Sequence, residues 1–254
     1  YINTKCLLSN MKIKNRIYLN KEIEKNQIID FNTKHSHYLS SVLRSKVGDN
    51  VCVFNESEEY ILELTSVGRR KASGTVLSKT QSIKKNYPLT LFFSPIKRAQ
   101  TEIIIQKCTE IGITKFQPVI MERTQFKTFN IDRLKLIAIE AVEQSNQISI
   151  PQINVPIHFE DFIKKNNESI IACCISEAAS KISEVLSDEN LIVKGVLIGP
   201  EGDFSDKEIK LIEENNMIIP ISLGNSVLKS ETACIVSSFL IKEFSNHALS
   251  LIHI

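Results

Sequence analysis

The stretch that decides the fold reads Ile198-Gly199-Pro200-Glu201-Gly202-Asp203-Phe204-Ser205. The apolar run 195–198 predicts a buried strand, and a Gly-Pro-x-Gly turn follows it. Ser205 with Glu208 three residues later is the capping-box signature of a helix start. The two glycines allow a positive φ or a close approach to a ligand. Ligands of open α/β sheets bind at the carboxyl ends of strands, so this turn is either a binding loop or a plain strand-to-helix connection.

A second loop of the same kind follows downstream, in Ile221-Ser222-Leu223-Gly224-Asn225-Ser226-Val227-Leu228-Lys229-Ser230-Glu231-Thr232-Ala233. It leaves a predicted strand through Gly224 and enters a helix whose first turn carries Glu231 and Thr232. Two such loops at the tips of neighbouring strands can enclose one pocket of backbone amides and carbonyls. We therefore expect a cavity between them.

Strands alternate with helices from residue 88 onward, which predicts an α/β layer with a mostly parallel sheet. Residues 16–80 instead show short strands separated by Gly and Asx turns, which is typical of a small β-barrel domain. The boundary is expected in the polar segment 81–87. The expected strands of the first part are 16–19, 28–31, 51–54, 59–67 and 74–79. Those of the second are 89–94, 115–119, 170–174, 194–198 and 218–223, with helices at 98–111, 131–145, 206–215 and 231–243.

Two helices carry apolar stripes that we expect to be buried. Asn32-Thr33 can begin a helix in the β domain. Its expected buried side is Tyr38, Leu39, Val42 and Leu43. The expected stripe of helix 98–111 is Ile103, Ile104, Cys108 and Ile111.

Charge is distributed unevenly along the chain, although the net charge is only +2. Residues 1–87 hold 15 Lys and Arg against 8 Asp and Glu, a balance of +7. Residues 88–254 hold 16 against 21, a balance of −5. A basic small module beside an acidic larger one suggests that the first part contacts a polyanion, although lysine-rich surfaces are common.

Several classes of protein are disfavoured by composition and motifs. No apolar run approaches the roughly 18 to 20 residues that cross a bilayer. Residues 1–10 lack the features of a secretory signal, so we interpret them as an N-terminal extension and expect a cytoplasmic protein. His35-x-His37 has no nearby Cys or carboxylate pair, so no metal site is expected. Six cysteines without C-x-x-C spacing are expected to be free buried thiols, namely Cys6, Cys52, Cys108, Cys173, Cys174 and Cys234.

An ordered set of motifs resembles one known family. In chain order these are His37-Tyr38-Leu39, Val42-Leu43-Arg44, Gly48-Asp49, Gln106-Lys107-x-Thr109-Glu110-Ile111-Gly112, Glu140-Ala141-x-Glu143-Gln144-Ser145, Gly199-Pro200-Glu201-Gly202, Leu223-Gly224 and Leu228-x-x-Glu231-Thr232-Ala233. The set is similar to that of the RsmE family of 16S ribosomal RNA uridine-N3 methyltransferases, within the SPOUT superfamily. The resemblance runs from about Met11 to the end of the chain.

The resemblance implies a PUA-like β-barrel RNA-binding domain at 11–80 and a SPOUT α/β methyltransferase domain with a C-terminal trefoil knot at 88–254. It also implies a homodimer that acts on 16S ribosomal RNA or the small subunit, with S-adenosylmethionine as methyl donor. The implied donor-binding residues are Leu197, Gly199, Pro200, Glu201, Gly202, Leu223, Gly224, Leu228, Thr232 and Ala233. Our candidates for RNA contacts are the basic residues Arg44, Lys46, Arg69, Arg70, Lys71, Lys107 and Arg123.

Roles for two further residues follow from the chemistry of the reaction. N3 of uracil is a neutral imide that must lose its proton before it attacks the sulfonium methyl group. Lys229 or Arg44 is expected to stabilise the resulting anion or a nearby phosphate. Glu231 is expected to accept the proton or to fix the loop.

The chain departs from the family pattern at four places. Asp203 stands where the family usually has a second Gly, and Ser226 and Lys229 stand where it usually has Arg. Gln147 or Ser149 also occupies a usual Arg position. Two alternatives therefore stay open: a non-catalytic RNA-binding or ribosome-assembly protein, or a related SPOUT methyltransferase acting on another RNA. Binding of S-adenosylmethionine tests the first, and mapping the methylated nucleotide tests the second.

Overall fold

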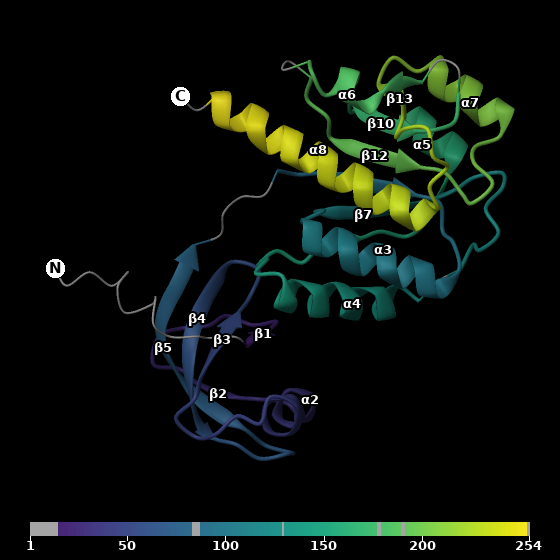
Figure 1. Cartoon of the computed structure of the whole chain (residues 1–254). Coiled ribbons are helices and arrows are strands. Elements are labelled where there is room, and N and C mark those ends of the chain that lie inside the picture. The colour runs from purple at the N-terminus through teal and green to yellow at the C-terminus, as the bar shows by residue number, and fades with distance from the viewer. Residues whose placement is uncertain (1–14, 83–86, 129, 177–178, 189–190, 253–254) are drawn as a thin grey trace. The chain divides into compact units, whose positions relative to one another are not determined.

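The computed structural model describes residues 15–82, 87–128, 130–176, 179–188 and 191–252 (Figure 1). Contacts divide the chain into two compact units. The first comprises Tyr1–Lys84 with Val142–Ser149, and the second comprises Lys85–Ala141 with Ile150–Ile254. The expected N-terminal extension 1–10, with Cys6, lies outside the described residues.

The first unit is a five-stranded sheet in the order β1-β3-β4-β5-β2. β1 pairs in parallel with β3, and the other pairings are antiparallel. Its core is apolar and includes Ile29, Leu39 and Leu62, none of which is measurably exposed. The strands are β1 (Arg16–Tyr18), β2 (Ile28–Asp30), β3 (Asn50–Phe54), β4 (Glu58–Ser66) and β5 (Ser73–Ser82).

The segment Val142–Ser149 belongs to the first unit because Arg16 holds it. Arg16 is only 8% exposed, and its Nε donates to Glu59 Oε2 at 2.7 Å. Nη1 donates to the carbonyl of Val142 at 2.9 Å, and Nη2 to that of Gln147 at 2.8 Å. A buried guanidinium is tolerated when its donors are paired in this way. The first unit therefore includes a segment from the middle of the chain.

The helix expected after Asn32 forms, but its geometry changes halfway. Asn32 caps α2 (Thr33–His37), its side chain accepting from the His35 N–H, and a π-helix follows at Tyr38–Val42. Hydrogen bonds five residues apart, such as Leu43 N to Tyr38 O at 2.9 Å, widen the turn. Leu39 is buried as expected. Val42, which was expected on the same side of the helix, is 60% exposed.

The second unit contains a sheet whose strands pair in parallel, in the order β11-β13-β10-β12-β6-β7-β8, with β9 beside β7. The strands are β6 (Thr90–Phe93), β7 (Lys115–Ile120), β8 (Gln152–Ile153), β9 (Ile157–His158), β10 (Ile170–Cys173), β11 (Ser180–Lys181), β12 (Gly195–Ile198) and β13 (Ile218–Ser222). The helices are α3 (Arg98–Ile111), α4 (Ile131–Gln144), α5 (Phe159–Lys165), α6 (Ile182–Val185), α7 (Asp206–Glu213) and α8 (Ser230–Ile252).

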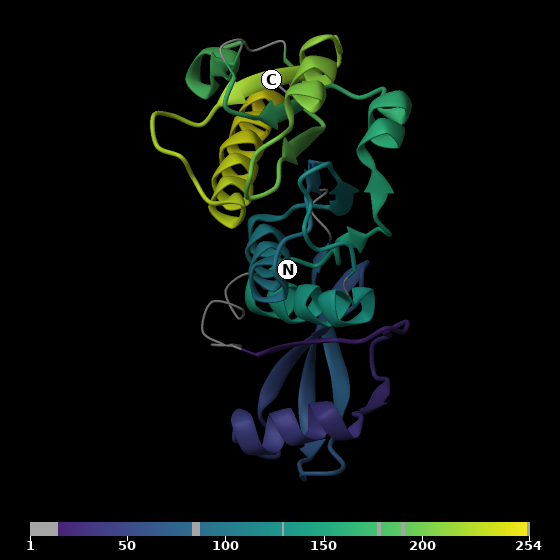
Figure 2. The ribbon, with the colours of Figure 1, turned by 90° about the vertical axis from the view of Figure 1, so that its right-hand side faces the viewer.

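Alternation along the buried strands builds two cores, one on each face of this sheet. In β12, Val196 and Ile198 pack in one core while Leu197 packs in the other. The first core is covered by α3 and α8, and the second by α5 and α7 (Figure 2). Sheets covered on both faces have near-continuous apolar strands, which explains the run 195–198.

The expected strands and helices of the α/β part are present, and most ends are shifted by a few residues, but α8 continues to Ile252 where an end at 243 was expected. The short elements β8, β9, β11, α5 and α6 were not anticipated. The expected stripe on α3 was partly wrong. Ile104 and Cys108 are fully buried, as is Ile105, but Ile103 is 42% exposed. Among the described residues, no helix has the length and apolar character needed to span a bilayer.

Candidate active site

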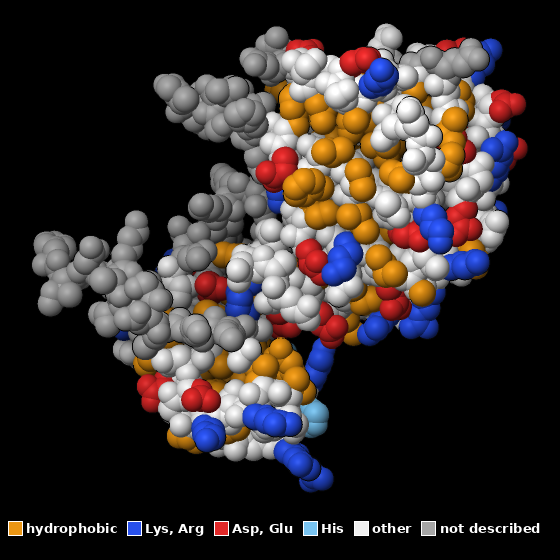
Figure 3. Space-filling view, in the orientation of Figure 1, with side chains coloured by type: hydrophobic (Ala, Val, Ile, Leu, Met, Phe, Trp, Pro, Cys, Tyr) orange, Lys and Arg blue, Asp and Glu red, His pale blue; other side chains and the backbone are white. Residues whose placement is uncertain are grey.

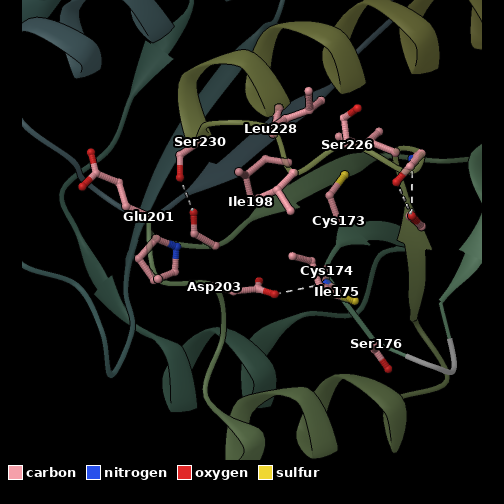
Figure 4. Close-up of a pocket in the computed structure, with 18 of the residues that line it drawn as sticks. Cys173, Cys174, Ile175, Ser176, Ile198, Glu201, Asp203, Ser226, Leu228 and Ser230 are labelled. Atoms are coloured by element: carbon pink, nitrogen blue, oxygen red, sulfur yellow. Dashed lines mark hydrogen bonds between the residues drawn. The ribbon is translucent and has the colours of Figure 1, made fainter.

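A cavity of about 450 Å³ opens at the carboxyl ends of β10, β12 and β13 (Figure 4). Parallel pairing brings these three ends to one edge of the sheet. The two loops singled out from the sequence do enclose it, although β12 and β13 are not neighbours, because β10 lies between them. The lining residues are Cys173, Cys174, Ile175, Ser176, Ile198, Gly199, Pro200, Glu201, Gly202, Asp203, Ser222, Leu223, Gly224, Asn225, Ser226, Val227, Leu228, Ser230 and Ala233.

The loop after β12 is held in a tight, fully bonded conformation. Asp203 adopts a left-handed φ of +59°, and its N–H donates to the carbonyl of Pro200 at 2.9 Å. Its carboxylate accepts from the N–H of Phe204 at 2.9 Å and from that of Ile175 at 3.1 Å. A Cβ on Gly199 would meet ring carbons of Phe204 at 3.0 to 3.3 Å. The loop therefore depends on glycine at 199 for close packing, and on Asp203 for its link to the end of β10.

The helix that follows this loop begins as the sequence predicted. Ser205 accepts from the Glu208 N–H, and the Glu208 carboxylate accepts from the Ser205 N–H at 2.9 Å, which confirms the capping box. Glu208 is buried, and its other oxygen accepts from the N–H of Glu122 at 2.8 Å. The Glu208 carboxylate therefore connects the N-terminus of α7 to the loop after β7.

The loop after β13 turns through Gly224, whose φ is +125°. The Ser222 hydroxyl lies 3.2 Å from the carbonyl oxygen of Gly224 and 3.3 Å from its N–H. Where the loop enters α8, the buried Ser230 hydroxyl donates to the carbonyl of Gly199 at 3.1 Å. This hydrogen bond joins the two glycine loops across the cavity (Figure 4).

The end of β10 supplies a third wall that the sequence analysis did not identify. Cys173, Cys174, Ile175 and Ser176 follow one another without a glycine or a capping signal. Burial, followed by the negative charges of Asp203 and Glu213, raises the pKa of the Cys174 thiol to about 12. Burial also raises the pKa of Cys173. Both thiols are therefore protonated at neutral pH and are poor nucleophiles.

Most of the residues predicted to bind the donor line this cavity, but two do not. Leu197 is fully buried in the core beneath it, and Thr232 is exposed on the first turn of α8. The two predicted catalytic residues lie where the loop after β13 enters α8. Lys229 is exposed between the lining residues Leu228 and Ser230, and Glu231 is partly buried. The predicted donor-binding residues found in the lining are Gly199, Pro200, Glu201, Gly202, Leu223, Gly224, Leu228 and Ala233.

Two predicted RNA-binding residues of the second unit already have protein partners. Nη1 of Arg123 donates to the carbonyls of Gly202 at 2.7 Å and Phe204 at 3.1 Å, so this side chain braces the glycine loop. Lys107 pairs with Glu110 at 2.8 Å. Arg123 also borders a shallow recess that it shares with Phe126 and the outer side of the loop.

The predicted RNA-binding residues of the first unit have exposed side chains. Arg44 follows the π-helix in a left-handed conformation, with φ +54°. Lys46 lies in the turn before β3. Arg69, Arg70 and Lys71 lie in the turn between β4 and β5. These basic side chains are therefore accessible at the surface of this unit.

The cavity has the size and chemistry expected of a small-molecule site. Its volume falls within the range of about 300 to 1,000 Å³ typical of ligand pockets. Glycine loops offer backbone groups, and Ile198, Leu223 and Leu228 offer apolar surface, which suits a nucleoside with a polar tail. In the described part of the chain, no group of three or more His, Cys, Asp or Glu residues is arranged to hold a metal ion. Such a site can bind and orient a ligand.

Comparison with known proteins agrees with this geometry. The sequence model of the RNA methyltransferase domain family matches residues 84–242, and that of the RNA methyltransferase PUA domain matches residues 31–77. The ribosomal RNA small subunit methyltransferase E of Rickettsia conorii is 33% identical over 242 residues, covering 92% of this chain and 97% of that relative. The protein of the same name from Synechocystis is 33% identical, covering 81% of this chain and 69% of that relative.

Solved structures share the whole fold. The ribosomal RNA small subunit methyltransferase E of Neisseria gonorrhoeae, bound to S-adenosylmethionine, superposes with a TM-score of 0.80 at 23% identity, over 90% of this chain and 97% of that one. A protein of Legionella pneumophila in complex with the same cofactor gives a TM-score of 0.78 at 25% identity, over 91% of this chain and 97% of that one. The family match and the 33% identity over most of its length show that this chain belongs to the ribosomal RNA small subunit methyltransferase E family.

Proposed function

We propose that this protein transfers the methyl group of S-adenosylmethionine to N3 of a uridine in the 16S RNA of the small ribosomal subunit. The observation that carries the proposal is the cavity enclosed by loops 199–203 and 223–228 at the carboxyl ends of parallel strands. The names of the relatives support small-subunit ribosomal RNA as the substrate. The choice of uridine N3 follows from the family resemblance.

Within this function, the protein acts chiefly by alignment. The bound donor supplies an electrophilic methyl group, and transfer in line requires the attacking nitrogen and the methyl carbon to be held in one geometry. The loops that enclose the cavity are restrained by the hydrogen bonds of Ser230 to Gly199 and of Asp203 to Ile175. Restrained loops favour one orientation of the ligand, which is the main catalytic requirement here.

Lys229 and Glu231 are the residues that we assign to the chemistry of the acceptor base. The Lys229 ammonium group would stabilise the negative charge that develops on the uracil imide. Glu231 would accept the N3 proton or fix the loop. The position of both residues beside Leu228 and Ser230, which line the cavity, supports the assignment.

We further propose that residues 11–80 form the RNA-binding domain and residues 88–254 the methyltransferase domain. The match to the PUA domain family and the exposed basic turns of the first unit support the former. The proposed phosphate contacts are Arg44, Lys46, Arg69, Arg70 and Lys71, with Lys107 and Arg123 in the second unit. The trefoil knot and a cytoplasmic location stay predictions.

A homodimer is proposed as well, and the exposed apolar surface of the second unit supports it. Hydrophobic side chains gather on the face where α3 and α8 lie (Figure 3). Ile103 on α3 is 42% exposed, and Phe239 on α8 is 53% exposed. Light scattering should give twice the mass of the chain. Phe239→Asp should release monomers, whereas Val155→Asp, a control at an exposed apolar residue between β8 and β9, should not.

The enzymatic proposal is tested with small subunits that lack the modification. The purified protein and S-adenosylmethionine carrying a labelled methyl group are incubated with them, and the RNA is digested to nucleosides for mass spectrometry. N3-methyluridine is the expected product. Because a methyl at N3 blocks base pairing, primer extension should stop at the modified nucleotide. Label in a ribose or in another base would contradict the proposed position, and donor binding without any label in RNA would contradict the enzymatic role.

A further inference from the structure

The wall of the donor cavity is acidic. Its described lining residues include the carboxylates of Glu201 and Asp203 but no Lys, Arg or His. The Glu201 carboxylate is exposed and points away from the centre of the cavity (Figure 4). Asp203 is therefore the carboxylate that is fixed in the wall, between the loop after β12 and the end of β10.

The Asp203 carboxylate is held in place by backbone groups, and among the described residues no Lys or Arg forms an ion pair with it. Its two oxygens accept from the neutral backbone N–H groups of Phe204 and Ile175. The guanidinium of Arg123 bonds the flanking carbonyls of Gly202 and Phe204 and does not line the cavity. The adjacent Cys174 thiol responds to this charge, since Asp203 is the largest contribution after burial to its raised pKa. Asp203 therefore places a fixed carboxylate in the wall of the cavity.

This carboxylate matters because methyl transfer changes the charge of the ligand. The sulfur–methyl bond breaks and a nitrogen–methyl bond forms, while the N3 proton leaves. The donor enters as a sulfonium with one net positive charge and leaves as a neutral thioether. A fixed carboxylate attracts the cation and is indifferent, to first order, to the neutral product.

We propose that Asp203 makes this cavity selective for the cationic donor over the neutral product, so that it favours donor binding and product release. The inference rests on the proposed function. Asp203 stands where the family usually has Gly, and the proposal gives this side chain a role. In this proposal, Asp203 affects which ligand binds and not the rate of methyl transfer.

The test compares two ligands by titration calorimetry, in the wild-type protein and in Asp203→Asn. Asn tolerates the left-handed conformation and is nearly isosteric, but it carries no charge. Losing one hydrogen bond would weaken both ligands alike, so the readout is the ratio of their affinities. We expect the preference for S-adenosylmethionine over S-adenosylhomocysteine to fall about threefold to tenfold. Sinefungin, which has an amine in place of the sulfonium, should weaken as the donor does.

Two further variants separate charge from position. Asp203→Gly removes charge and hydrogen bonds together, and should show the same reduced ratio as Asp203→Asn. Asp206→Asn makes an identical charge change three residues away, at an exposed position outside the lining, and should leave the ratio unchanged. An unchanged ratio in both Asp203 variants would overturn the inference. Failure of the wild-type protein to bind either ligand would instead contradict the proposed function.

Discussion

Side chains carry the proposed ligand contacts of the first unit, whereas the cavity of the second unit is built largely from loop backbone. The first unit exposes Arg69, Arg70 and Lys71 in a turn, where each cation can meet a phosphate. The second encloses its cavity with restrained glycine loops and one fixed carboxylate. In our proposal, the basic turn of the first unit binds the RNA polyanion, and the acidic wall of the second unit favours the cationic donor. We therefore expect that a single side-chain change in one unit affects the binding of one ligand and leaves the other unaffected.

The sharpest separation is expected from Lys229→Ala. Removing one group that stabilises developing charge typically costs about a hundredfold or more in rate. Methylation measured with labelled donor should fall by that order, while donor affinity from calorimetry stays within about twofold. Lys207→Ala, at an exposed position on α7 outside the cavity lining, is the control and should be fully active. Unchanged turnover in Lys229→Ala would reject the assigned role.

A second separation is expected from the double variant Arg69→Ala, Arg70→Ala in the first unit. Loss of two phosphate contacts should weaken RNA binding about tenfold and reduce the log–log salt slope by roughly one unit per contact. Donor binding should not change. Lys21→Ala removes an exposed cation from another turn of the same unit and is the matched control. An affinity for RNA that is insensitive to salt would remove this assignment.

Alkali should instead affect both units alike, since both contain buried thiols. Burial raises the pKa of Cys52 in the first unit, and of Cys108 in the second, to about 12 from an ordinary 9.0. Because these folded-state values lie above the unfolded value, stability is full below pH 9 and is lost as the pH rises toward 12. At pH 10 each thiol should lower the free energy of unfolding by about 1 kcal/mol. Urea unfolding at pH 8 and 10 measures this, and Cys108→Ala should reduce the difference; equal midpoints at both pH values would contradict it.

The smallest effect is expected from Ser230→Ala, which removes the hydrogen bond between the two glycine loops. One such bond contributes about 0.5 to 1.5 kcal/mol, so donor affinity should fall about twofold to tenfold. RNA binding should be unaffected. Ser222→Ala, which removes a bond confined to one loop, is the control and should have less effect. An equal loss of donor affinity in both variants would show that the hydrogen bond between Ser230 and Gly199 is not what restrains the loops.

Local signals made much of the fold and of the cavity predictable. The apolar run 195–198, the glycine turn and the capping box each depend on residues within a few positions, and all are present in the structure. The family membership inferred from the motif order is likewise confirmed. The basic turn at 69–71 was also visible, because Gly68 and charged residues mark a turn.

What the sequence did not reveal depends on contacts between distant segments. The position of β10 between β12 and β13 is a property of strand order, and no local pattern encodes it. The third wall was missed for that reason, since the Cys173-Cys174 run resembles any buried strand. The hydrogen bonds of Arg123 to the carbonyls of Gly202 and Phe204 were not foreseen, because these residues lie about 80 positions away along the chain. The π-helix was also not predicted, because no apolar pattern in the sequence of residues 38–42 indicated it.

The left-handed backbone at position 203 bears on how this wall could have arisen. Glycine reaches that conformation freely, and Asp is among the few other residues that do so at small cost. A glycine codon also becomes an aspartate codon by one nucleotide substitution. A lineage could therefore have gained the negative charge in one mutational step, with the loop already in the shape that the new side chain requires.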